Sequence, residues 1–377
     1  MGKRELVLVS VFVLLGIVVY QFTAPPPPPG SEGVSVGGIF RSIRRGIEGA
    51  RESATADSTQ TAAVPASVSM LRIVVPRVSD LTVTGEDRPD ISAALHVTAR
   101  GFDQAEAKAN ARAVKLMIET VGDGIVVRQD FTSTATVSRG TPPPMFSVTL
   151  AVPKRLSLRM EPHVGRLALT NLSAAEIVSS RGETNITGIS GSLKVVHSGG
   201  PLEIDGAASL KLTSRNSRGT VKHVSGPASI DSTGGELALA AIGGPLEIEG
   251  QNANLRIADD KGMKAPLRIN LRGGELRVDG LQTEARIDGR NSDIGVQLDA
   301  PVPVTIYNLG QISLTPPAGG YTLDAAASEG RVTVEDGNLT ATEGPDSHAE
   351  GKVRGGGPPI TLRTTRGGID VRKPGGK

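Results

Sequence analysis

The sequence predicts an all-β protein, and within that class a right-handed β-solenoid with rungs of about 18 residues. First, a short phrase recurs from Gly165 onward: a small residue, then apolar residues two and four positions later, with polar residues between. Second, aromatic residues make up only 2% of the chain, whereas glycine is abundant with 47 residues. Stacked units around a thin aliphatic core suit both observations.

Small residues begin the repeated strands at intervals of 16 to 21 positions. In each strand the apolar residues at +2 and +4 are expected to face inward, and a second strand is expected about seven residues earlier. The repeat begins at Gly165, Gly182, Gly200, Gly219, Gly235, Ala253, Gly274, Ser292, Gly310 and Gly330. Corners with positive φ are expected at Gly206, Gly250, Gly280 and Gly289, each of which follows an acidic residue. A Greek-key sandwich is the alternative fold.

The amino-terminal residues 1–23 are expected to form a signal anchor with one transmembrane helix. Residues 6–22 are mostly apolar and follow Lys3 and Arg4, which predicts a cytoplasmic amino terminus and a periplasmic or extracellular remainder. A cleaved signal peptide is the alternative, but the small residues near Ala24 are followed directly by prolines. Residues 24–69 are expected to be a linker, in which 39–47 is either a basic surface helix or solvated chain.

Two ordered regions are expected after the linker. Residues 70–160 form a β-rich leading region, with a short helix near 103–112 that Asp103 caps. Residues 161–372 form the solenoid repeats, with a loop at 344–359. The strands expected in the leading region are 71–75, 81–83, 91–99, 114–119, 125–128 and 146–152.

Composition and spacing predict no catalytic residue, no cofactor and no metal site. The chain has no cysteine, and its formal net charge of +2 gives no reason to expect nucleic acid as a partner. The histidines show no i, i+4 pair and are not expected to stack, although His223 falls at an inward position. The densest carboxylate pair, Asp259 and Asp260, is interpreted as an exposed charged turn.

Basic residues at the outward +3 position are the candidate ligand-facing residues. They are Lys222, Arg256 and Arg277, with Arg272, Arg286 and Arg290 nearby. Such a stripe could bind an anionic glycan, lipid or polymer. The alternative is a solvated face, because the acidic residues Glu183, Glu236, Glu275 and Asp293 occupy the outward +1 position.

Three stretches of the chain resemble the DUF4097-type family of bacterial exported proteins. They are Val-Thr-Leu-Ala-Val-Pro at 148–153 followed by Leu-Ser-Leu at 156–158, the phrase Gly-Arg-Leu-Ala-Leu at 165–169, and the closing segment 360–371. The family, also called adhesin-like β-strand repeat proteins, is similar to adhesin head (GIN) domains. The resemblance covers about residues 70 to 372 and implies an exported, often tethered β-solenoid without catalytic residues.

Together these features predict a non-enzymatic, membrane-tethered binding or scaffolding module at the bacterial cell envelope. Its expected partners are the membrane, through the amino-terminal helix, and an envelope protein or polysaccharide. Two alternatives are a β-helix enzyme that acts on polysaccharides and an envelope-stress sensor. An enzyme would need acid, base and charge-stabilising groups that converge across adjacent rungs, and the sequence pattern shows none at matching positions.

Overall fold

The computed structural model describes residues 12, 15, 16, 19, 50–76, 78–131, 142–258, 263–337, 339–344 and 346–374. These residues are mostly in β-strands, which join in one open sheet, so the predicted all-β class is confirmed. The chain divides into two compact units. The first takes in the described parts of Met1–Ala56, Thr98–Ala113 and Ser133–Pro144, and the second contains Asp57–Val97, Val114–Thr132 and Met145–Lys377.

The strands before the repeats are longer than the sequence pattern suggests. The helix α3 spans Gln104–Arg112 and is capped by Asp103, whose side chain accepts a hydrogen bond from the Glu106 backbone N–H. The strands are β1 (Glu52–Ala63), β2 (Met70–Val74), β3 (Asp80–Glu86), β4 (Asp90–Gly101), β5 (Val114–Val121), β6 (Gly124–Phe131), β7 (Met145–Pro153), β8 (Ser157–Met160) and β9 (His163–Val164). Strand β1 lies within the predicted linker, because its Ser, Thr and Ala residues suit a mostly exposed strand as well as a solvated chain.

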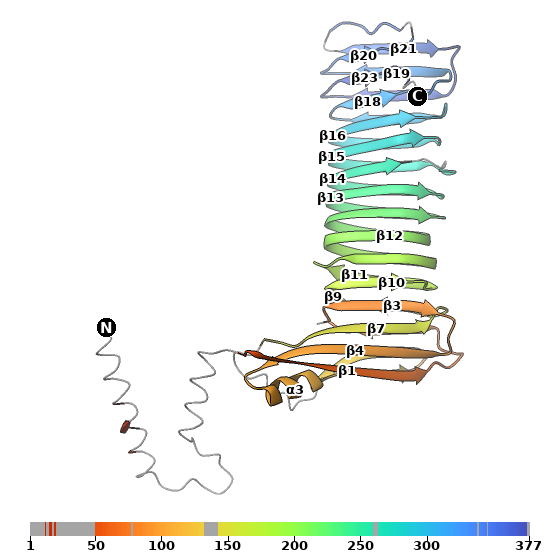
Figure 1. Ribbon diagram of the computed structural model, residues 1–377. Helices are drawn as coiled ribbons and strands as arrows, with labels where there is room; N and C mark the ends of the chain where they lie inside the picture. The colour runs from red at the N-terminus through yellow and green to blue at the C-terminus, as the bar shows by residue number, and fades with distance from the viewer. Residues whose placement is uncertain are drawn as a thin grey trace. The chain divides into compact units, whose positions relative to one another are not determined.

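The repeats form a stack of parallel strands (Figure 1). Pairing partners lie one repeat apart: Leu210 pairs with Ala228, which pairs with Leu246. A Greek-key sandwich needs antiparallel neighbours, so the pairing in this stack excludes that alternative. The strands are β10 (Arg166–Thr170), β11 (Ala174–Ser180), β12 (Thr184–Val224), β13 (Ala228–Ile242), β14 (Leu246–Ala258), β15 (Leu267–Leu281), β16 (Ala285–Leu298), β17 (Val304–Asn308) and β18 (Ile312–Thr315).

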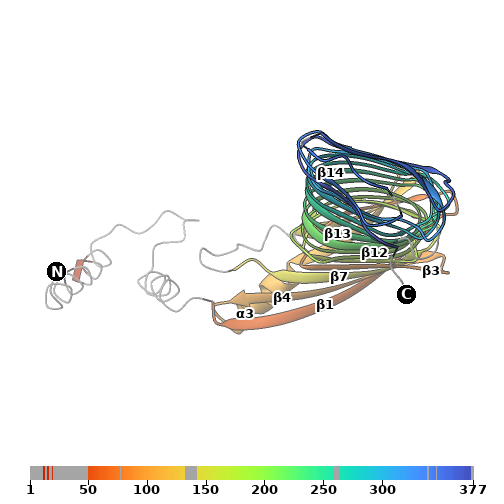
Figure 2. The ribbon, with the colours of Figure 1, turned by 90° about the horizontal axis from the view of Figure 1, so that it is seen from above.

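Aliphatic side chains fill the interior of the stack in register. Ile230, Ile248, Ile269, Ile287 and Ile306 pair in sequence across five neighbouring strands, and each is at most 2% exposed. Figure 2 looks along this stack and shows the strands lying over one another around the interior. Each strand therefore buries its inward residues against the strands directly above and below it.

Asparagine or glycine in the left-handed conformation turns the chain at one edge of each repeat. The residues are Asn216, Gly234, Asn252, Gly273 and Asn291, with φ of 50°, 65°, 50°, 71° and 54°. These two residue types tolerate positive φ best. Two predicted corners are wrong: Gly250 and Gly289 have ordinary φ values and lie inside strands, where an added Cβ would meet Leu271 or Asn308.

The carboxyl-terminal strands close the stack out of sequence order. They are β19 (Tyr321–Ala327), β20 (Val332–Val334), β21 (Ser347–Val353), β22 (Pro359–Thr364) and β23 (Ile369–Val371). Strand β22 pairs in parallel with both β17 and β19, and β23 pairs with both β18 and β20. The predicted loop at 344–359 instead contains β21, which pairs antiparallel with β19. The hydrophobic alternation in β21 is weak because Gly351 and charged residues interrupt it.

A partly buried ion pair joins the segment after β20 to the end of β21. The Arg354 guanidinium donates to both carboxylate oxygens of Asp336 at 2.7 and 2.8 Å and to the carbonyls of Pro317 and Gly319. Tyr321 donates its hydroxyl to the same carboxylate at 3.0 Å, and burial is the first cause that raises the pKa of this phenol. Removing the Arg354 guanidinium would leave the buried Asp336 carboxylate without a cationic partner.

The predicted signal anchor falls almost wholly outside the described residues. Of residues 6–22, the structure describes Phe12, Leu15, Gly16 and Val19, and these four are helical. Among the residues that are described, none belongs to a helix long and apolar enough to cross a membrane. The segment 39–47 and the carboxylates Asp259 and Asp260 also lie outside the described residues.

Candidate functional site: an arginine groove across the stacked strands

An open groove crosses the outer side of strands β13 to β17, β22 and β19. Its volume is about 1100 Å³. We call it the arginine groove, because two neighbouring strands each place arginines along it. The residues that line it are Asp231, Thr233, Glu249, Gly250, Gln251, Asn270, Leu271, Arg272, Arg286, Asp288, Gly289, Arg290, Tyr307, Asn308, Leu309, Ala326, Ser328, Arg363, Thr364 and Thr365.

Parallel register sorts the outward side chains of the groove into columns. One column runs through Asp231, Glu249, Asn270, Asp288, Tyr307 and Arg363, each paired with the next. A second column lies two residues further along the strands and runs through Thr233, Gln251, Arg272 and Arg290. Neighbours within a column are therefore about 4.8 Å apart at the backbone.

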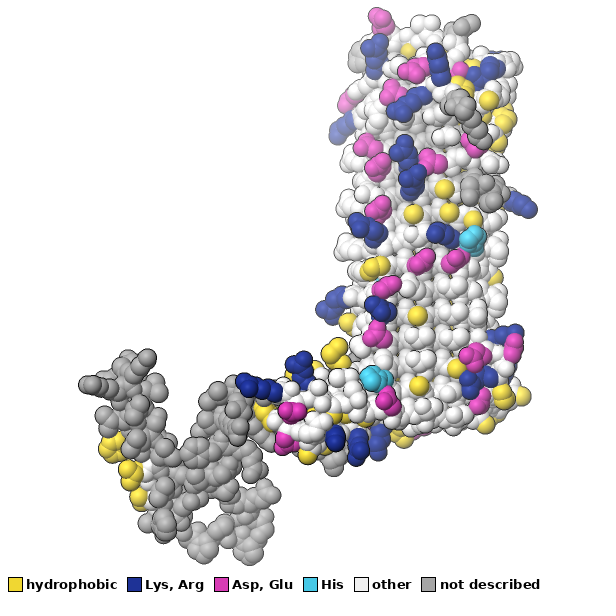
Figure 3. Space-filling model, viewed as in Figure 1, with side chains coloured by type: hydrophobic (Ala, Val, Ile, Leu, Met, Phe, Trp, Pro, Cys, Tyr) yellow, Lys and Arg dark blue, Asp and Glu magenta, His cyan; other side chains and the backbone are white. Residues whose placement is uncertain are grey.

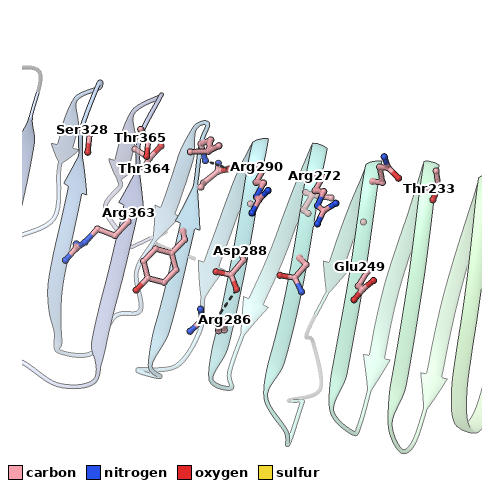
Figure 4. Close-up of a pocket in the computed structure, with 18 of the residues that line it drawn as sticks. Thr233, Glu249, Arg272, Arg286, Asp288, Arg290, Ser328, Arg363, Thr364 and Thr365 are labelled. Carbon is pink, nitrogen blue, oxygen red and sulfur yellow. Dashed lines mark hydrogen bonds and ion pairs between the residues drawn. The ribbon is translucent and has the colours of Figure 1, made fainter.

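Strands β15 and β16 carry the same pattern, Arg-x-Asn/Asp-x-Arg, one repeat apart. The pattern reads Arg-Ile-Asn-Leu-Arg at 268–272 and Arg-Ile-Asp-Gly-Arg at 286–290. Because alternate residues of a strand face the same side, each pattern presents two arginines and one polar residue outward. Figure 4 shows Arg272 and Arg290 on neighbouring strands along one edge of the groove.

The arginines of the groove differ in whether they have a carboxylate partner. Arg286 bonds Asp288 at 3.0 Å, and Arg363 bonds both oxygens of Asp324. The hydrogen bond from Arg363 holds the pKa of the Asp324 carboxyl below its usual value. Arg272 and Arg290 are exposed, and within the described part of the chain neither contacts a carboxylate.

An aromatic ring lies beside these arginines. Tyr307 is 43% exposed, and the Arg286 guanidinium lies over its ring, 5.7 Å from the centroid. Leu309, two residues further on, is also exposed and lines the groove. The groove thus combines an aromatic surface with charged and amide side chains, a combination common in binding sites for small molecules and polymers.

The predicted candidates Lys222, Arg256 and Arg277 lie outside the lining of the groove. Arg256 and Arg277 are register partners on the strand segments that follow the left-handed corners, and they share the Asp279 carboxylate at 3.2 and 3.6 Å. Lys222 pairs with Ala240 and belongs to another column. The prediction that Lys222 lies beside the arginines depends on Gly219 as the start of that repeat, whereas Ser217 is the residue that pairs with Gly235.

Two expectations about the histidines are wrong. His223 is exposed instead of inward, with φ of 54°, and its ring nitrogen bonds Asp205 at 2.6 Å. The left-handed residue breaks the alternation on which the prediction relied. His163 and His197 share one column of the stack, with Ser179 between them, because both pair in register with Ser179.

His163 on β9 and His197 on β12 are buried in the interior, on either side of β11. His197 donates from Nε2 to the Gly200 carbonyl and accepts the Ser179 hydroxyl at Nδ1, 2.8 Å away. His163 donates from Nε2 to the Arg166 carbonyl. Burial lowers the pKa of both rings below 6.5. Both are therefore neutral structural residues near neutral pH, and within the described residues no three His, Asp or Glu side chains form a metal-binding group.

Carboxylates also converge in the groove, although the sequence pattern gave no sign of it. Asp231 and Glu249 are register partners, and Asp288 lies in the same column two strands further along. Asp231, Glu249 and Asp288 each lie four residues before the small residue that starts the second strand of their repeat. The predicted pattern covers only the positions that follow that small residue, so it does not include them.

Comparisons with known proteins give only distant structural similarity. No family model and no curated protein matches the chain, so membership of the DUF4097-type family stays a prediction. A candidate adhesin from Parabacteroides distasonis is 12% identical with a TM-score of 0.39, and covers 69% of this chain and 97% of its own. A candidate adhesin from Parabacteroides merdae is 10% identical with a TM-score of 0.36, and covers 84% and 96%. A candidate lipid-binding protein from Parabacteroides distasonis is 10% identical with a TM-score of 0.30, and covers 84% and 97%.

Proposed function

We propose that the chain is a non-enzymatic, membrane-tethered binding or scaffolding module of the bacterial cell envelope, built on a β-solenoid. Parallel pairing at offsets near 18 residues supports the solenoid. The apolar segment 6–22 after two basic residues supports the tether. The arginine groove is the binding site, and this groove across neighbouring strands is the observation that carries the proposal.

The shape of the groove suits an extended partner. Its lining comes from seven strands. A polymer chain that lies across these strands therefore contacts a new set of outward side chains at each strand. Repeat proteins present extended binding surfaces of this kind. A polymer or an extended segment of an envelope protein therefore fits better than a small molecule enclosed on all sides.

Binding of the full chain to bacterial envelope fractions tests the proposal. We expect saturable binding that a triple variant of the groove, R272A/R290A/Y307A, weakens by roughly tenfold or more. The matched control is R256A/R277A, which removes two arginines outside the groove and should bind like the unaltered chain. Equal binding by the triple variant would place the site elsewhere, and no saturable binding at all would refute the proposed function.

A polysaccharide-active enzyme is the second candidate, favoured by the carboxylate column of Asp231, Glu249 and Asp288. Glycosidases use two carboxyl groups, one of which keeps its proton, usually through burial. Asp231 and Glu249 are exposed and Asp288 is held by Arg286, which favours binding over catalysis. Release of reducing ends or unsaturated sugars from envelope polysaccharide, lost in D231N/E249Q, would establish the enzyme instead.

A further inference from the structure

We propose that the arginine groove binds an anionic polysaccharide, with charged groups of the polymer on Arg272 and Arg290 and a sugar ring stacked on Tyr307. The inference rests on the proposed function, because it names the chemical class of ligand for the same groove. It is carried by the pairing of two arginines that contact no carboxylate of the described residues, by the exposed ring beside them and by the acidic end of the groove.

Arg272 and Arg290 form a ready anion site. They are direct register partners on β15 and β16, so their backbones are about 4.8 Å apart. Like charges directly opposite each other on neighbouring strands repel. One carboxylate, sulfate or phosphate group lying between the two planar guanidinium groups would replace that repulsion with charge-assisted hydrogen bonds.

A second hollow points to the same pair. It has a volume of about 570 Å³ and adjoins the left-handed corner of the strands. Arg272, Arg290 and Gln251 line both hollows, and Asn252 and Asn291 line only the second. The two guanidinium groups therefore stand on the ridge between two open spaces, where a polymer can reach them from either side.

Tyr307 supplies the surface on which a sugar ring can stack. The C–H groups on one side of a sugar ring are apolar and pack against an aromatic ring, while its hydroxyls stay free to hydrogen-bond. Tyr307 pairs with Asp288, and Arg290 follows Asp288 by two residues. The Cα atoms of Tyr307 and Arg290 are thus roughly 8 Å apart, which one sugar unit with a charged substituent can span.

The acidic end of the groove argues for a polysaccharide over a uniformly charged polyanion. Asp231 and Glu249 are exposed and lie in the same column as Tyr307. A continuous phosphate backbone would be repelled there. Sugar hydroxyls, in contrast, donate hydrogen bonds to carboxylates, so a polymer with both charged groups and free hydroxyls satisfies both ends.

Direct titration of the full chain with four defined polymers tests the inference. The probes are polygalacturonate, sparsely carboxymethylated dextran, neutral dextran and polyglutamate, each at low and at physiological salt. We expect one or both charged glycans to bind more tightly than dextran and polyglutamate, and R272A/R290A to weaken that binding by roughly tenfold or more. Y307A should weaken binding of the charged glycan by roughly threefold to tenfold and leave weak polyglutamate binding unchanged.

The matched variant R256A/R277A removes the same charge from outside the groove and should change the affinity less than about twofold. All substituted side chains are exposed, so unaltered thermal unfolding confirms that each variant is folded. The inference would be overturned if dextran bound as tightly as both charged glycans. It would also be overturned if polyglutamate bound as tightly as the charged glycans and Y307A left their affinity unchanged. If none of the four polymers binds while envelope fractions still do, the inference fails and the proposed function stands. If neither the four polymers nor the envelope fractions bind, the inference and the proposed function both fail.

Discussion

Two faces of the same stack each carry a pair of arginines in register, and the two pairs differ in whether a carboxylate contacts them. On the segments after the left-handed corners, Arg256 and Arg277 lie one above the other and share the Asp279 carboxylate. On the segments before the corners, Arg272 and Arg290 also lie one above the other, but neither has a carboxylate partner among the described residues. Figure 3 shows, on the face turned to the viewer, basic and acidic side chains interleaved along the stack.

The difference shows what parallel stacking does to a surface. Because every outward residue has its counterpart directly above and below, a charge repeated in the sequence becomes a row of like charges. A face with no partner to bind can offset the row with one well-placed carboxylate. The groove leaves its row uncompensated, which is the physical reason to look for a ligand there.

The largest effect should come from the interior that both faces share. Ile287→Ala removes a fully buried side chain from the isoleucine column, and we expect the free energy of unfolding to fall by about 2–5 kcal/mol. Denaturant unfolding of the full chain measures it, with the exposed Asp293→Ala as control. A loss below about 1 kcal/mol would mean that the column is loosely packed.

Acid should lower the local stability of the histidine-bearing repeats more than that of the strands that line the groove. His163 and His197 have pKa values lowered by burial, so the unfolded chain binds more protons than the folded chain at acidic pH. With both rings neutral, the free energy of unfolding is unaffected by them above about pH 6.5, and it falls as the pH drops below that value. Hydrogen exchange at about pH 7 and about pH 5 should show β9 and β11 losing protection before β15 and β16, a region without histidine.

His197→Gln removes one of these titrating groups and should flatten the fall in stability. The exposed Gln251→Ala, which removes no titrating group, serves as its control and should leave the pH dependence unchanged. An equal loss of protection in β11 and β15 would show instead that the stack opens as a single unit.

The smallest effect on stability, and the sharpest test of the comparison, is Asp279→Ala. The change frees Arg256 and Arg277 and should cost less than about 1 kcal/mol, because the ion pairs are exposed. If charge alone attracts an anionic glycan, this variant gains a second site. We expect little gain, since the groove also supplies Tyr307. Calorimetric titration with polygalacturonate, which counts sites, decides between the two.

The fold class was predictable because the apolar alternation is local. Leu237, Leu239, Leu276 and Val278 occupy predicted inward positions and are at most 1% exposed. The order of the last strands was not predictable, since nothing in the segment 360–371 indicates that it pairs with β17. Strand β1 was missed for the opposite reason: its polar composition does not distinguish an exposed strand from a linker.

The residues of the groove could be predicted only in part from the sequence. The sequence places Arg272, Arg286 and Arg290 near the predicted stripe, and the Arg-x-Asn/Asp-x-Arg pattern, repeated on two strands, is a usable signal. Register decides which residues share a face, and it depends on loops of unequal length. The loop between β14 and β15 adds three residues, so Leu246 pairs with Leu267 at an offset of 21 instead of 18. Tyr307 gave no local sign of its surroundings.

The insertion of β22 between β17 and β19 makes this part of the stack depend on contacts between residues far apart in the sequence. Most strands of this stack meet a neighbour about 18 residues away, so pairing can follow the chain as it emerges. The place between β17 and β19 is instead filled by residues 359–364, whose pairing partners in β17 are 56 residues earlier in the chain. Arg363 and Thr364 arrive with that strand and complete the lining of the groove. Without residues 359–364, β17 and β19 would each have an unpaired edge where β22 now lies, and the groove would lack Arg363 and Thr364.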